Sequence, residues 1–543
     1  MNRCLLSLLV ALGALAGATA AEPPRTIRYE EYQDKVHGVW LGKNIGVLLG
    51  EPTEFALQWS KPGEPHRILF QGQDISNVRD WIRGAPDGAH DQDDLYINLI
   101  SLEALERYGI QVTGAQIAER WLANNPGVAC ANAAALNNFR YRILPPLSGH
   151  PAFSRNITDI DAQIDVDVWG MITPGMPRTC WEYTDRAARI TNYGEGVYAA
   201  VFIASLISEG FFEKDISRLI DRARCNVPAR SQYAQMIDDV RRWHREFPDW
   251  RDARQALAAK YESLGGIHAV LNSGAVLLGL LYGEGDFDRS LFISMLCGWD
   301  SDCNPSTVGG ILGAVHGATG IPERWQAPLK DIYRGGTVKA YAPEIAISEL
   351  GRRTARIGER LVVASGGAVR GKGSDRVLLI PAQRPVHPPL DPLDAEYVRS
   401  VRARVAAAAA RDLQAGPNRQ ETACRRLQRV AQEDRSLLTS DVLNRAAVLA
   451  AGRNHRVVAQ AALLLGEAGD PRASESLLRV AASPDFAVED RVRAVGLLAP
   501  SAGGPAGERL AAIFLAEPDP AGPVGAAVLA ALVKAPESAL LGA

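Results

Sequence analysis

The stretch Gly38-Val39-Trp40-Leu41-Gly42-Lys43-Asn44-Ile45-Gly46-Val47-Leu48-Leu49-Gly50 places a glycine at every fourth position of a largely apolar segment. Positions four residues apart lie on the same face of an α-helix, so the glycines form one stripe without side chains. Because glycine has no Cβ atom, another backbone can come close to this stripe. The segment therefore predicts a helix against which a second element packs at short range.

The composition indicates a helical protein with more than one domain. A chain of 543 residues, with 47% hydrophobic residues and a net charge of -3, is too long for one ordinary core. Its 59 basic and 62 acidic residues offer no large cationic surface, so nucleic acid is not expected as a partner. Sparse aromatic residues and abundant glycine and alanine favour closely packed helices, and we expect an all-α fold.

The first residues, 1–21, have the pattern of a secretory signal peptide. Arg3 precedes the apolar run Leu5 to Ala16, and the small residues Ala18 to Ala21 that follow suit a cleavage site. The run is shorter than the ~20 residues of a membrane-spanning helix, so an uncleaved anchor is the alternative. We expect export to the periplasm or the cell exterior, and no membrane span after cleavage.

Six cysteines would remain after cleavage: Cys130, Cys180, Cys225, Cys297, Cys303 and Cys424. An oxidising compartment would permit disulfides between them, but their scattered spacing shows no disulfide framework. Disulfides and buried free thiols both remain open.

The chain is expected to contain a helical domain over residues 29–365, here called the catalytic domain because the acidic clusters described below lie in it. Helical runs alternate there with glycine, proline and asparagine, without sustained alternation of period two. One predicted helix runs from Asp94 to Tyr108 and stops at Gly109. Another runs roughly from Ala342 to Val362.

Beyond this domain, residues 366–397 are expected to form a linker or strap, because prolines crowd together between Pro381 and Pro392. Residues 398–543 are rich in alanine and leucine, and the segment beginning at Ala461 is weakly repeated at Ala494 and Ala527, at a spacing of roughly 33 residues. This spacing favours HEAT-like stacked helix pairs, and an irregular helical bundle is the alternative.

Two acidic clusters stand at the starts of predicted helices: His90-Asp91-Gln92-Asp93-Asp94 and Gly298-Trp299-Asp300-Ser301-Asp302-Cys303-Asn304. Adjacent carboxylates repel one another, and hard divalent cations that prefer carboxylate oxygens relieve that repulsion. Either cluster alone is also typical of helix-capping acids on a wet surface. Together, in one apolar-rich domain, they favour a metal site.

These segments resemble the ADP-ribosylglycohydrolase family, of the dinitrogenase reductase-activating glycohydrolase type. The opening helix, with its ending Glu51-Pro52-Thr53-Glu54, is similar to the first motif of that family. Gln92-Asp93-Asp94 resembles its Thr-Asp-Asp metal motif, and Trp299-Asp300-Ser301-Asp302 resembles its Gly-Asp-Thr-Asp motif, which a Gly-rich helix follows. The resemblance covers about Tyr29 to Trp325.

The resemblance implies a helical hydrolase with two Mg²⁺ or Mn²⁺ ions, ligated by Asp93, Asp94, Asp300 and Asp302. Glu54 is the implied catalytic residue, for proton transfer or substrate gating, and Glu51 competes with it for this role. Paired metals can hold a ribose diol and activate water at the anomeric carbon.

Three residues depart from the pattern of the family. Gln92 and Cys303 stand where threonines often complete the metal shell, so both are candidates for that shell; a thiol is a poor Mg²⁺ ligand, and Cys303 is alternatively a packing residue. Asn192 stands where many members have a histidine near the substrate. Asn192 and Asp165 are candidate substrate-binding residues.

The implied activity is metal-dependent hydrolysis of an N- or O-glycosidic bond to ADP-ribose or a related sugar. The expected substrate is a small molecule or an ADP-ribosylated protein. An exported glycosidase that acts on another sugar or on a nucleoside is one alternative. A non-catalytic module that senses a ligand or binds a protein is another, and the C-terminal repeats could hold a protein partner in either case.

Overall fold

The computed structural model describes residues 24–77, 87–502 and 505–534, so the expected signal peptide at 1–21 lies outside the described residues. In the described part of the chain, no helix combines the length and the apolar character that a membrane span needs. The chain divides into two compact units. Unit 1 comprises Met1–Ala131 and Thr158–Leu390, and unit 2 comprises Asn132–Ile157 and Asp391–Ala543.

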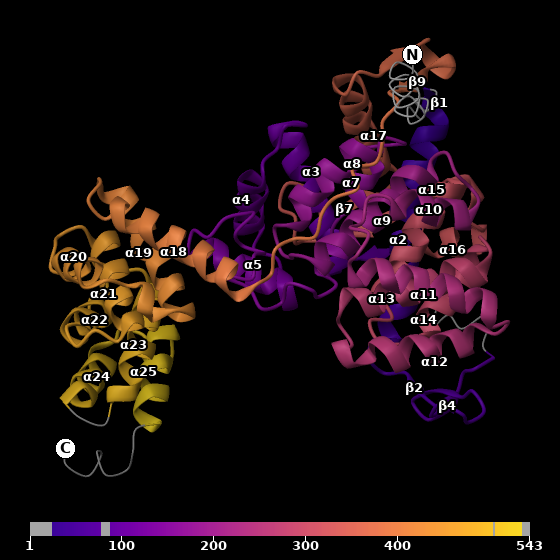
Figure 1. The fold of residues 1–543 in the computed structure, drawn as a ribbon. Coiled ribbons are helices and arrows are strands. Elements are labelled where there is room, and N and C mark those ends of the chain that lie inside the picture. The colour runs from indigo at the N-terminus through magenta and orange to yellow at the C-terminus, as the bar shows by residue number, and fades with distance from the viewer. Residues whose placement is uncertain (1–23, 78–86, 503–504, 535–543) are drawn as a thin grey trace, which may run out of the picture. The chain divides into compact units, whose positions relative to one another are not determined.

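Unit 1 is built mainly of helices, which confirms the expected all-α fold (Figure 1). Its helices are α2 (Tyr29–Gly50), α3 (Asp93–Tyr108), α4 (Gly114–Asn124), α6 (Asp161–Ile164), α7 (Asp167–Met171), α8 (Pro177–Ala188), α9 (Glu195–Gly210), α10 (Ile216–Arg224), α11 (Gln232–Glu246), α12 (Trp250–Tyr261), α13 (Ala269–Gly283), α14 (Phe287–Leu296), α15 (Cys303–His316), α16 (Glu323–Gln326) and α17 (Ile347–Ala364). Helix α5 (Cys130–Arg140) begins in unit 1 and continues in unit 2.

Short strands form small three-stranded sheets in unit 1. They are β1 (Arg25–Arg28), β9 (Val377–Ile380) and β8 (Ala368–Arg370) in one sheet; β2 (Gln58–Trp59), β3 (Ile68–Phe70) and β4 (Gln73–Asp74) in another; and β5 (Ala89–His90), β6 (Ile332–Arg334) and β7 (Glu344–Ala346) in the third. All pairs are antiparallel except β5 with β6. Because Glu344–Ala346 pair with β6, α17 begins at Ile347, later than the expected Ala342.

The glycine stripe of α2 packs directly on the backbone of α15. A Cβ atom added to Gly42 would lie 2.0 Å from the carbonyl oxygen of Gly309, so no other residue fits there without a shift. The facing pairs are Gly38 with Gly313, Gly42 with Gly309, Gly46 with Pro305 and Gly50 with Ser301. This order is antiparallel, so the C-terminal end of α2 meets the N-terminal end of α15.

A buried lysine ties this helix pair to a third helix. Lys35 on α2 donates hydrogen bonds to the carbonyl oxygens of Gly210 at 3.2 Å, Ala314 at 3.0 Å and Val315 at 3.0 Å. The acceptors belong to the ends of α9 and α15, so the ammonium supplies donors to carbonyls near two helix C-termini.

Residues 366–397, expected as a linker or strap, contain β8 and β9 in their first half. The segment that follows β9 has no regular secondary structure and is held to unit 1 by hydrogen bonds: Gln383 Nε2 donates to Thr179 Oγ1 at 2.8 Å, and the Val386 N–H donates to Asn226 Oδ1 at 3.1 Å. This part of the chain is therefore a strap on unit 1 up to about Leu390.

Unit 2 consists of successive helix pairs. They are α18 (Ala395–Asp412) with α19 (Pro417–Glu433), α20 (Ser440–Ala450) with α21 (His455–Ala468), α22 (Ala473–Ala482) with α23 (Val488–Leu498), and α24 (Pro505–Ala516) with α25 (Pro523–Val533). The second helices pack one after another, α19 on α21, α21 on α23 and α23 on α25. The weak sequence repeat places Ala461, Ala494 and Ala527 on three of these second helices.

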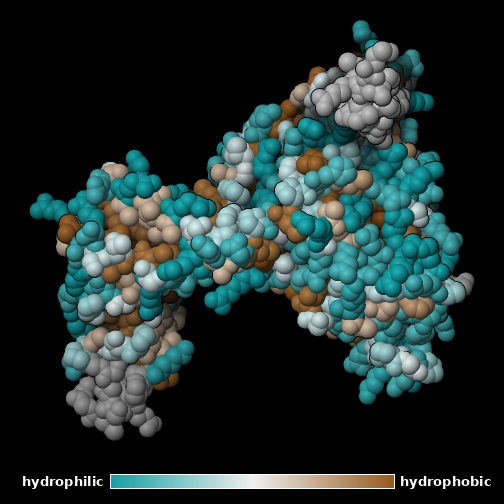
Figure 2. Space-filling view, in the orientation of Figure 1, coloured by the Kyte–Doolittle hydropathy of each residue, from teal (hydrophilic) through white to brown (hydrophobic). Residues whose placement is uncertain are grey.

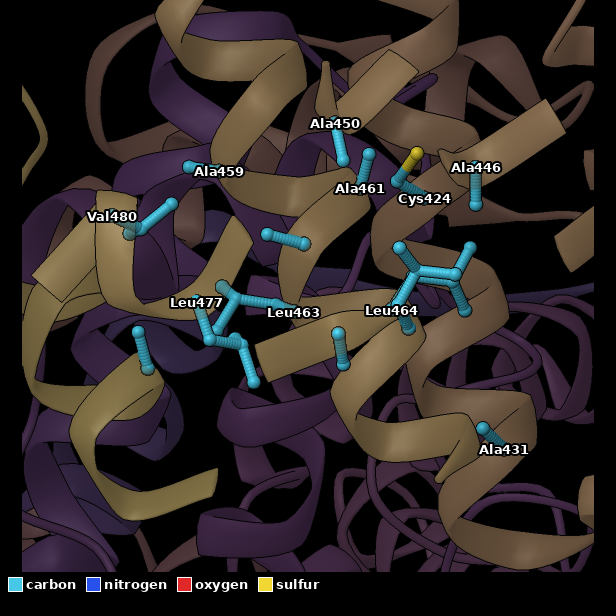
Figure 3. Close-up of a cluster of buried hydrophobic side chains, with 14 of the residues drawn as sticks. Cys424, Ala431, Ala446, Ala450, Ala459, Ala461, Leu463, Leu464, Leu477 and Val480 are labelled. Atoms are coloured by element: carbon cyan, nitrogen blue, oxygen red, sulfur yellow. The ribbon is translucent and has the colours of Figure 1, made fainter. Parts of the chain in front are cut away.

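Alanine, leucine and valine side chains fill the core between these pairs. Figure 3 shows Cys424 and Ala431 of α19, Ala461, Leu463 and Leu464 of α21, and Leu477 and Val480 of α22 within one buried cluster. A buried polar chain crosses the same helices, because Gln428 Nε2 donates to Gln460 Oε1 at 3.1 Å and Gln460 Nε2 donates to Asp490 Oδ1 at 2.8 Å. Gln428, Gln460 and Asp490 lie on the successive second helices α19, α21 and α23, so each of these helices contributes one residue to the polar chain.

Residues 132–157, which the sequence placed inside the catalytic domain, pack with unit 2 instead. Ile143 and Phe153 are part of its hydrophobic cluster. Arg429 on α19 donates to Asn138 Oδ1 at 2.8 Å, and Arg402 on α18 donates to the Ala152 carbonyl at 2.7 Å. Pairing with distant helices decides this assignment, and the local sequence of the segment carries no sign of it.

The face of the molecule shown in Figure 2 is mainly hydrophilic on unit 1, with small apolar areas between the polar residues. All six cysteines of the described residues are free thiols.

The contact between α2 and α15 should tolerate no side chain at its centre. We expect Gly42→Ala to lower the free energy of unfolding by about 3 kcal/mol or more, because the added methyl group meets rigid backbone. Thermal unfolding followed by circular dichroism measures this effect. Gly496→Ala on α23 is the control, since that glycine is exposed, has open space beside it, and should gain up to about 1 kcal/mol from the better helix former. Equal melting temperatures for Gly42→Ala and the unchanged protein would contradict the close contact.

Candidate metal centre

The antiparallel register of α2 and α15 brings Glu54 to the loop that carries Asp300 and Asp302. Thr53 Oγ1 and Ser301 Oγ lie 2.9 Å apart, within hydrogen-bond distance. The Phe55 N–H donates to the Trp299 carbonyl at 2.9 Å, and both residues have left-handed backbone, with φ of 50° and 60°. Such conformations are uncommon for bulky residues and occur where the surroundings enforce them, so the two loops are tightly fixed to each other.

Arg254 also holds the loop that precedes Asp300. Its guanidinium lies over the rings of Trp59 and Trp299, 4.4 Å and 4.2 Å from the ring centroids, and its Nε donates to the Cys297 carbonyl at 3.1 Å. The cation therefore holds the backbone just before Asp300 through both stacking and a hydrogen bond.

The first acidic cluster starts helix α3 and joins the second through Gln92. Gln92 is the N-cap of α3, and its Oε1 accepts from the Asp94 N–H at 2.8 Å. Its Nε2 donates to Asp302 Oδ2 at 2.9 Å. The side-chain amide of Gln92 thus connects the two aspartate clusters, and its oxygen, the atom that a metal would need, already caps the helix.

Buried carboxylate oxygens without donors lie at this junction. Asp94 Oδ2, Asp300 Oδ1 and Asp302 Oδ1 have no hydrogen-bond partner among the described residues. Ligand atoms of Asp94, Asp302 and Cys303 lie within 4.8 Å of one another, and so do those of Glu54, Asp300 and Asp302. Asp302 belongs to both groups. Oxygens in this arrangement fit divalent cations, because an unpaired buried charge is otherwise costly.

The pKa values of these carboxyls reflect the same cost of burying unpaired negative charges. Burial, together with the nearby Asp94 and Asp302, raises the pKa of Asp93 to about 7. Burial raises the pKa of Asp300 well above its ordinary value, and Asp302 adds to this shift. The pKa of Asp302 is also raised by burial. The cluster resists full ionisation unless cations neutralise it.

Of the two glutamates near the end of α2, Glu54 is the one that belongs to the centre. Burial, with Asp302 and Asp94 next in effect, raises the pKa of Glu54 to about 7, so both of its protonation states exist near neutral pH. Glu51 instead forms an ion pair with His90, with oxygen and Nε2 3.1 Å apart. The geometry favours Glu54 over Glu51 for proton transfer.

Cys303 is the first residue of α15, and its Sγ atom lies within 4.8 Å of carboxylate oxygens of Asp94 and Asp302. Burial raises the pKa of its thiol well above the ordinary value, and the charge of Asp300 raises it further. Without a cation beside it the thiol therefore keeps its proton, and Cys303 stays a candidate both for the metal shell and for a packing residue beside the centre.

The two expected substrate-binding residues lie on neighbouring segments. Asp165 is buried at the C-terminal end of α6. Asn192 is fully buried beneath the start of that helix, where its Oδ1 accepts from the Ala162 N–H at 3.1 Å and its Nδ2 donates to the Asp159 carbonyl at 2.7 Å. Asn192 therefore supports the segment that carries Asp165, and substrate binding by either residue stays a prediction.

Sequence patterns did not identify two residues that contact the centre. Asn272 Oδ1 accepts from the Asp300 N–H at 3.3 Å and from Asn304 Nδ2 at 3.0 Å, so it orders the loop before α15. Lys43 Nζ lies 3.1 Å from Asp94 Oδ1. A charged residue inside the apolar glycine helix was the available signal for Lys43; Asn272 had none.

A cavity of about 370 Å³ lies next to this region but is separate from the aspartates. Glu51 and His90 border it, and its walls are mostly apolar, with Leu48, Leu49 and Trp325. None of the four aspartates lines it, so the carboxylate cluster and not this cavity defines the candidate site.

The family model for ADP-ribosylglycohydrolase matches residues 28–356. Since the match spans more than half of the 543 residues, the chain belongs to the ADP-ribosylglycohydrolase family. This membership points to a glycosyl hydrolase.

A solved structure described as an "ADP-ribosylglycohydrolase-related protein complex" is similar at 20% sequence identity, with a TM-score of 0.42, over 61% of this chain and 99% of that chain. No curated protein sequence matches the chain.

Asp302 should be the most sensitive ligand, because it belongs to both groups of ligand atoms. We expect Asp302→Asn to weaken Mn²⁺ binding by more than about 100-fold, beyond the usual loss for a residue that only supports a ligand. Isothermal titration calorimetry of the full chain measures this change. The exposed Asp238→Asn should bind Mn²⁺ like the unchanged protein. Undiminished binding by Asp302→Asn would place the metal elsewhere.

The raised pKa values predict that Mn²⁺ stabilises the protein more as pH rises. Asp93, Asp300 and Asp302 keep protons in the fold after the unfolded chain has lost them, so this contribution to stability is complete below the ordinary aspartate pKa of about 4. The part that comes from Asp93 is lost as the pH passes about 7, the pKa of that residue. Mn²⁺ requires ionised carboxylates, so the increase in melting temperature on adding Mn²⁺ should grow between about pH 5 and pH 8. A constant increase across this range would contradict the assignment.

Proposed function

We propose that this protein is a divalent-metal-dependent hydrolase that cleaves an N- or O-glycosidic bond to ADP-ribose or a related sugar. The observation that carries the proposal is the convergence of Asp94, Asp300 and Asp302, each with an unpartnered buried oxygen, near Asp93. These residues would hold two Mg²⁺ or Mn²⁺ ions. When bound, such ions polarise water and hold adjacent sugar hydroxyls.

Glu54 supplies the proton transfer in this proposal. Hydrolysis adds a hydroxyl group to the anomeric carbon and a proton to the departing nitrogen or oxygen, so one residue must move a proton at that carbon. Glu54 lies beside Asp300 and Asp302, and its pKa of about 7 allows it to accept the proton from water and release it to the leaving group. The aspartates would hold the ions, and Glu54 completes the proton balance.

The bond that is cleaved distinguishes the main hypothesis from its alternative. An exported enzyme, as residues 1–21 suggest, meets few ADP-ribosylated proteins, and this favours a nucleoside or another sugar glycoside as the alternative substrate. Assays of the mature chain with Mg²⁺ or Mn²⁺ should compare ADP-ribosylated peptides with nucleosides and simple glycosides. Release of ADP-ribose that Asp302→Ala abolishes supports the first class, and cleavage of sugars alone supports the second. No turnover on any substrate would favour a module that binds without catalysis.

Substitution of the two glutamates tests the role of Glu54. We expect Glu54→Gln to lower kcat/KM by about 10²–10⁴-fold, the usual loss when a proton-transfer group is removed. Glu51→Gln is the matched control three residues earlier, since its carboxylate pairs with His90, and it should stay within a few-fold of the unchanged enzyme. Steady-state kinetics on the best substrate gives both numbers. If the larger loss falls on Glu51→Gln, the assignment of Glu54 is wrong.

A further inference from the structure

Lys43 is a fully buried cation at the inner side of the candidate metal centre. It lies on α2, and its side chain is 1% exposed. Its ammonium is 3.1 Å from Asp94 Oδ1, 2.9 Å from Asp167 Oδ2 and 3.1 Å from the Ile164 carbonyl oxygen. A lysine ammonium has three N–H donors, so every donor of Lys43 has an acceptor.

Asp167, at the start of α7, is the second carboxylate that binds Lys43. It is 1% exposed, and its Oδ2 is also 3.4 Å from Asn98 Nδ2 on α3. Asn98 further donates to the carbonyls of Asp94 at 2.9 Å and Ile164 at 2.8 Å. Lys43, Asp167 and Asn98 therefore form one buried network behind Asp94.

This network is not explained by stability alone. One ammonium faces two carboxylates in the interior, and a buried ion pair of this kind gives little or no net stability compared with apolar packing. The network also distinguishes the two carboxylate oxygens of Asp94. Lys43 engages Asp94 Oδ1, while Asp94 Oδ2 has no donor among the described residues.

We propose that Lys43 is a positioning residue of the metal centre: held by Asp167, it fixes Asp94 Oδ1 so that Asp94 Oδ2 is presented to the ion. The inference rests on the proposed metal centre. Its physical benefit is pre-organisation, because a ligand whose rotamer is already fixed loses little conformational entropy when the ion binds. Lys43 touches no substrate in this role and acts through Asp94.

The first test is Mn²⁺ binding to Lys43→Met in the full chain, by calorimetry and by the electron paramagnetic resonance spectrum of the bound ion. We expect binding to weaken about 10–100-fold, the usual loss when the partner of a metal ligand is removed, and the spectrum to change. Lys35→Met is the matched control. Lys35 is also buried, lies eight residues earlier on α2 and uses all its donors, but its acceptors are backbone carbonyls away from the centre. It should lose thermal stability and bind Mn²⁺ like the unchanged protein.

A double variant separates positioning from folding. Lys43→Met alone leaves two buried carboxylates without a cation, and it can fail to fold for that reason. Adding Asp167→Asn restores the original balance of one net negative charge. We expect this double variant to fold and still to bind Mn²⁺ about 10–100-fold more weakly, because Asp94 Oδ1 has no ammonium to hold it.

The outcomes distinguish the two proposals. If the unchanged protein binds no Mn²⁺, the proposed metal centre is wrong and the inference fails with it. If the unchanged protein binds Mn²⁺ and the double variant binds it equally well, with the same spectrum, the metal centre stands and the positioning role of Lys43 is overturned. Weakened binding in Lys35→Met of the same size as in Lys43→Met would also overturn it, because any buried lysine of α2 would then suffice.

Discussion

The backbone contact between α2 and α15 determines the geometry on which the rest of unit 1 depends. Glycines at every fourth position let the two helices meet without intervening side chains, and the antiparallel order fixes which ends come together. Since the C-terminal end of α2 meets the N-terminal end of α15, Glu54 and Asp302 become neighbours although 248 residues separate Thr53 from its partner Ser301. A wider helix spacing would separate the loops that carry the chemistry.

The same contact creates the electrostatic problem of the site. Carboxylates from two clusters lie near its end in partly or fully buried positions, and this burial raises their pKa values. The chain meets part of this cost with its own groups: the Gln92 amide donates to Asp302, and the Lys43 ammonium binds Asp94. Asp94 Oδ2, Asp300 Oδ1 and Asp302 Oδ1 remain without donors among the described residues, which is the arrangement expected of a site for cations.

Unit 2 shows a different principle of construction. Its helices repeat at a nearly constant spacing, and each second helix packs on the next, so the core grows by addition of similar pairs. The segment 132–157 joins this core through Ile143, Phe153 and the hydrogen bonds of Asn138, although the chain on both sides of it belongs to unit 1. The two units are therefore connected by three passages of the chain, at residues 131–132, 157–158 and 390–391.

The sequence by itself determined the helical class, the glycine stripe and the family. It also singled out the four aspartates as candidate metal ligands. All of these depend on local periodicity and on short motifs. Helix α3 began within one residue of the expected Asp94 and ended at Tyr108, since Gln92 and Gly109 are local start and stop signals. Tertiary structure alone decided what surrounds these motifs. Lys43 contacts Asp94 and Asp167, which lie 51 and 124 residues away. Gln92 donates a hydrogen bond to Asp302, and Glu51 forms an ion pair with His90. Such contacts depend on how helices pack across long separations, and single side chains carry no periodic signal of their distant partners.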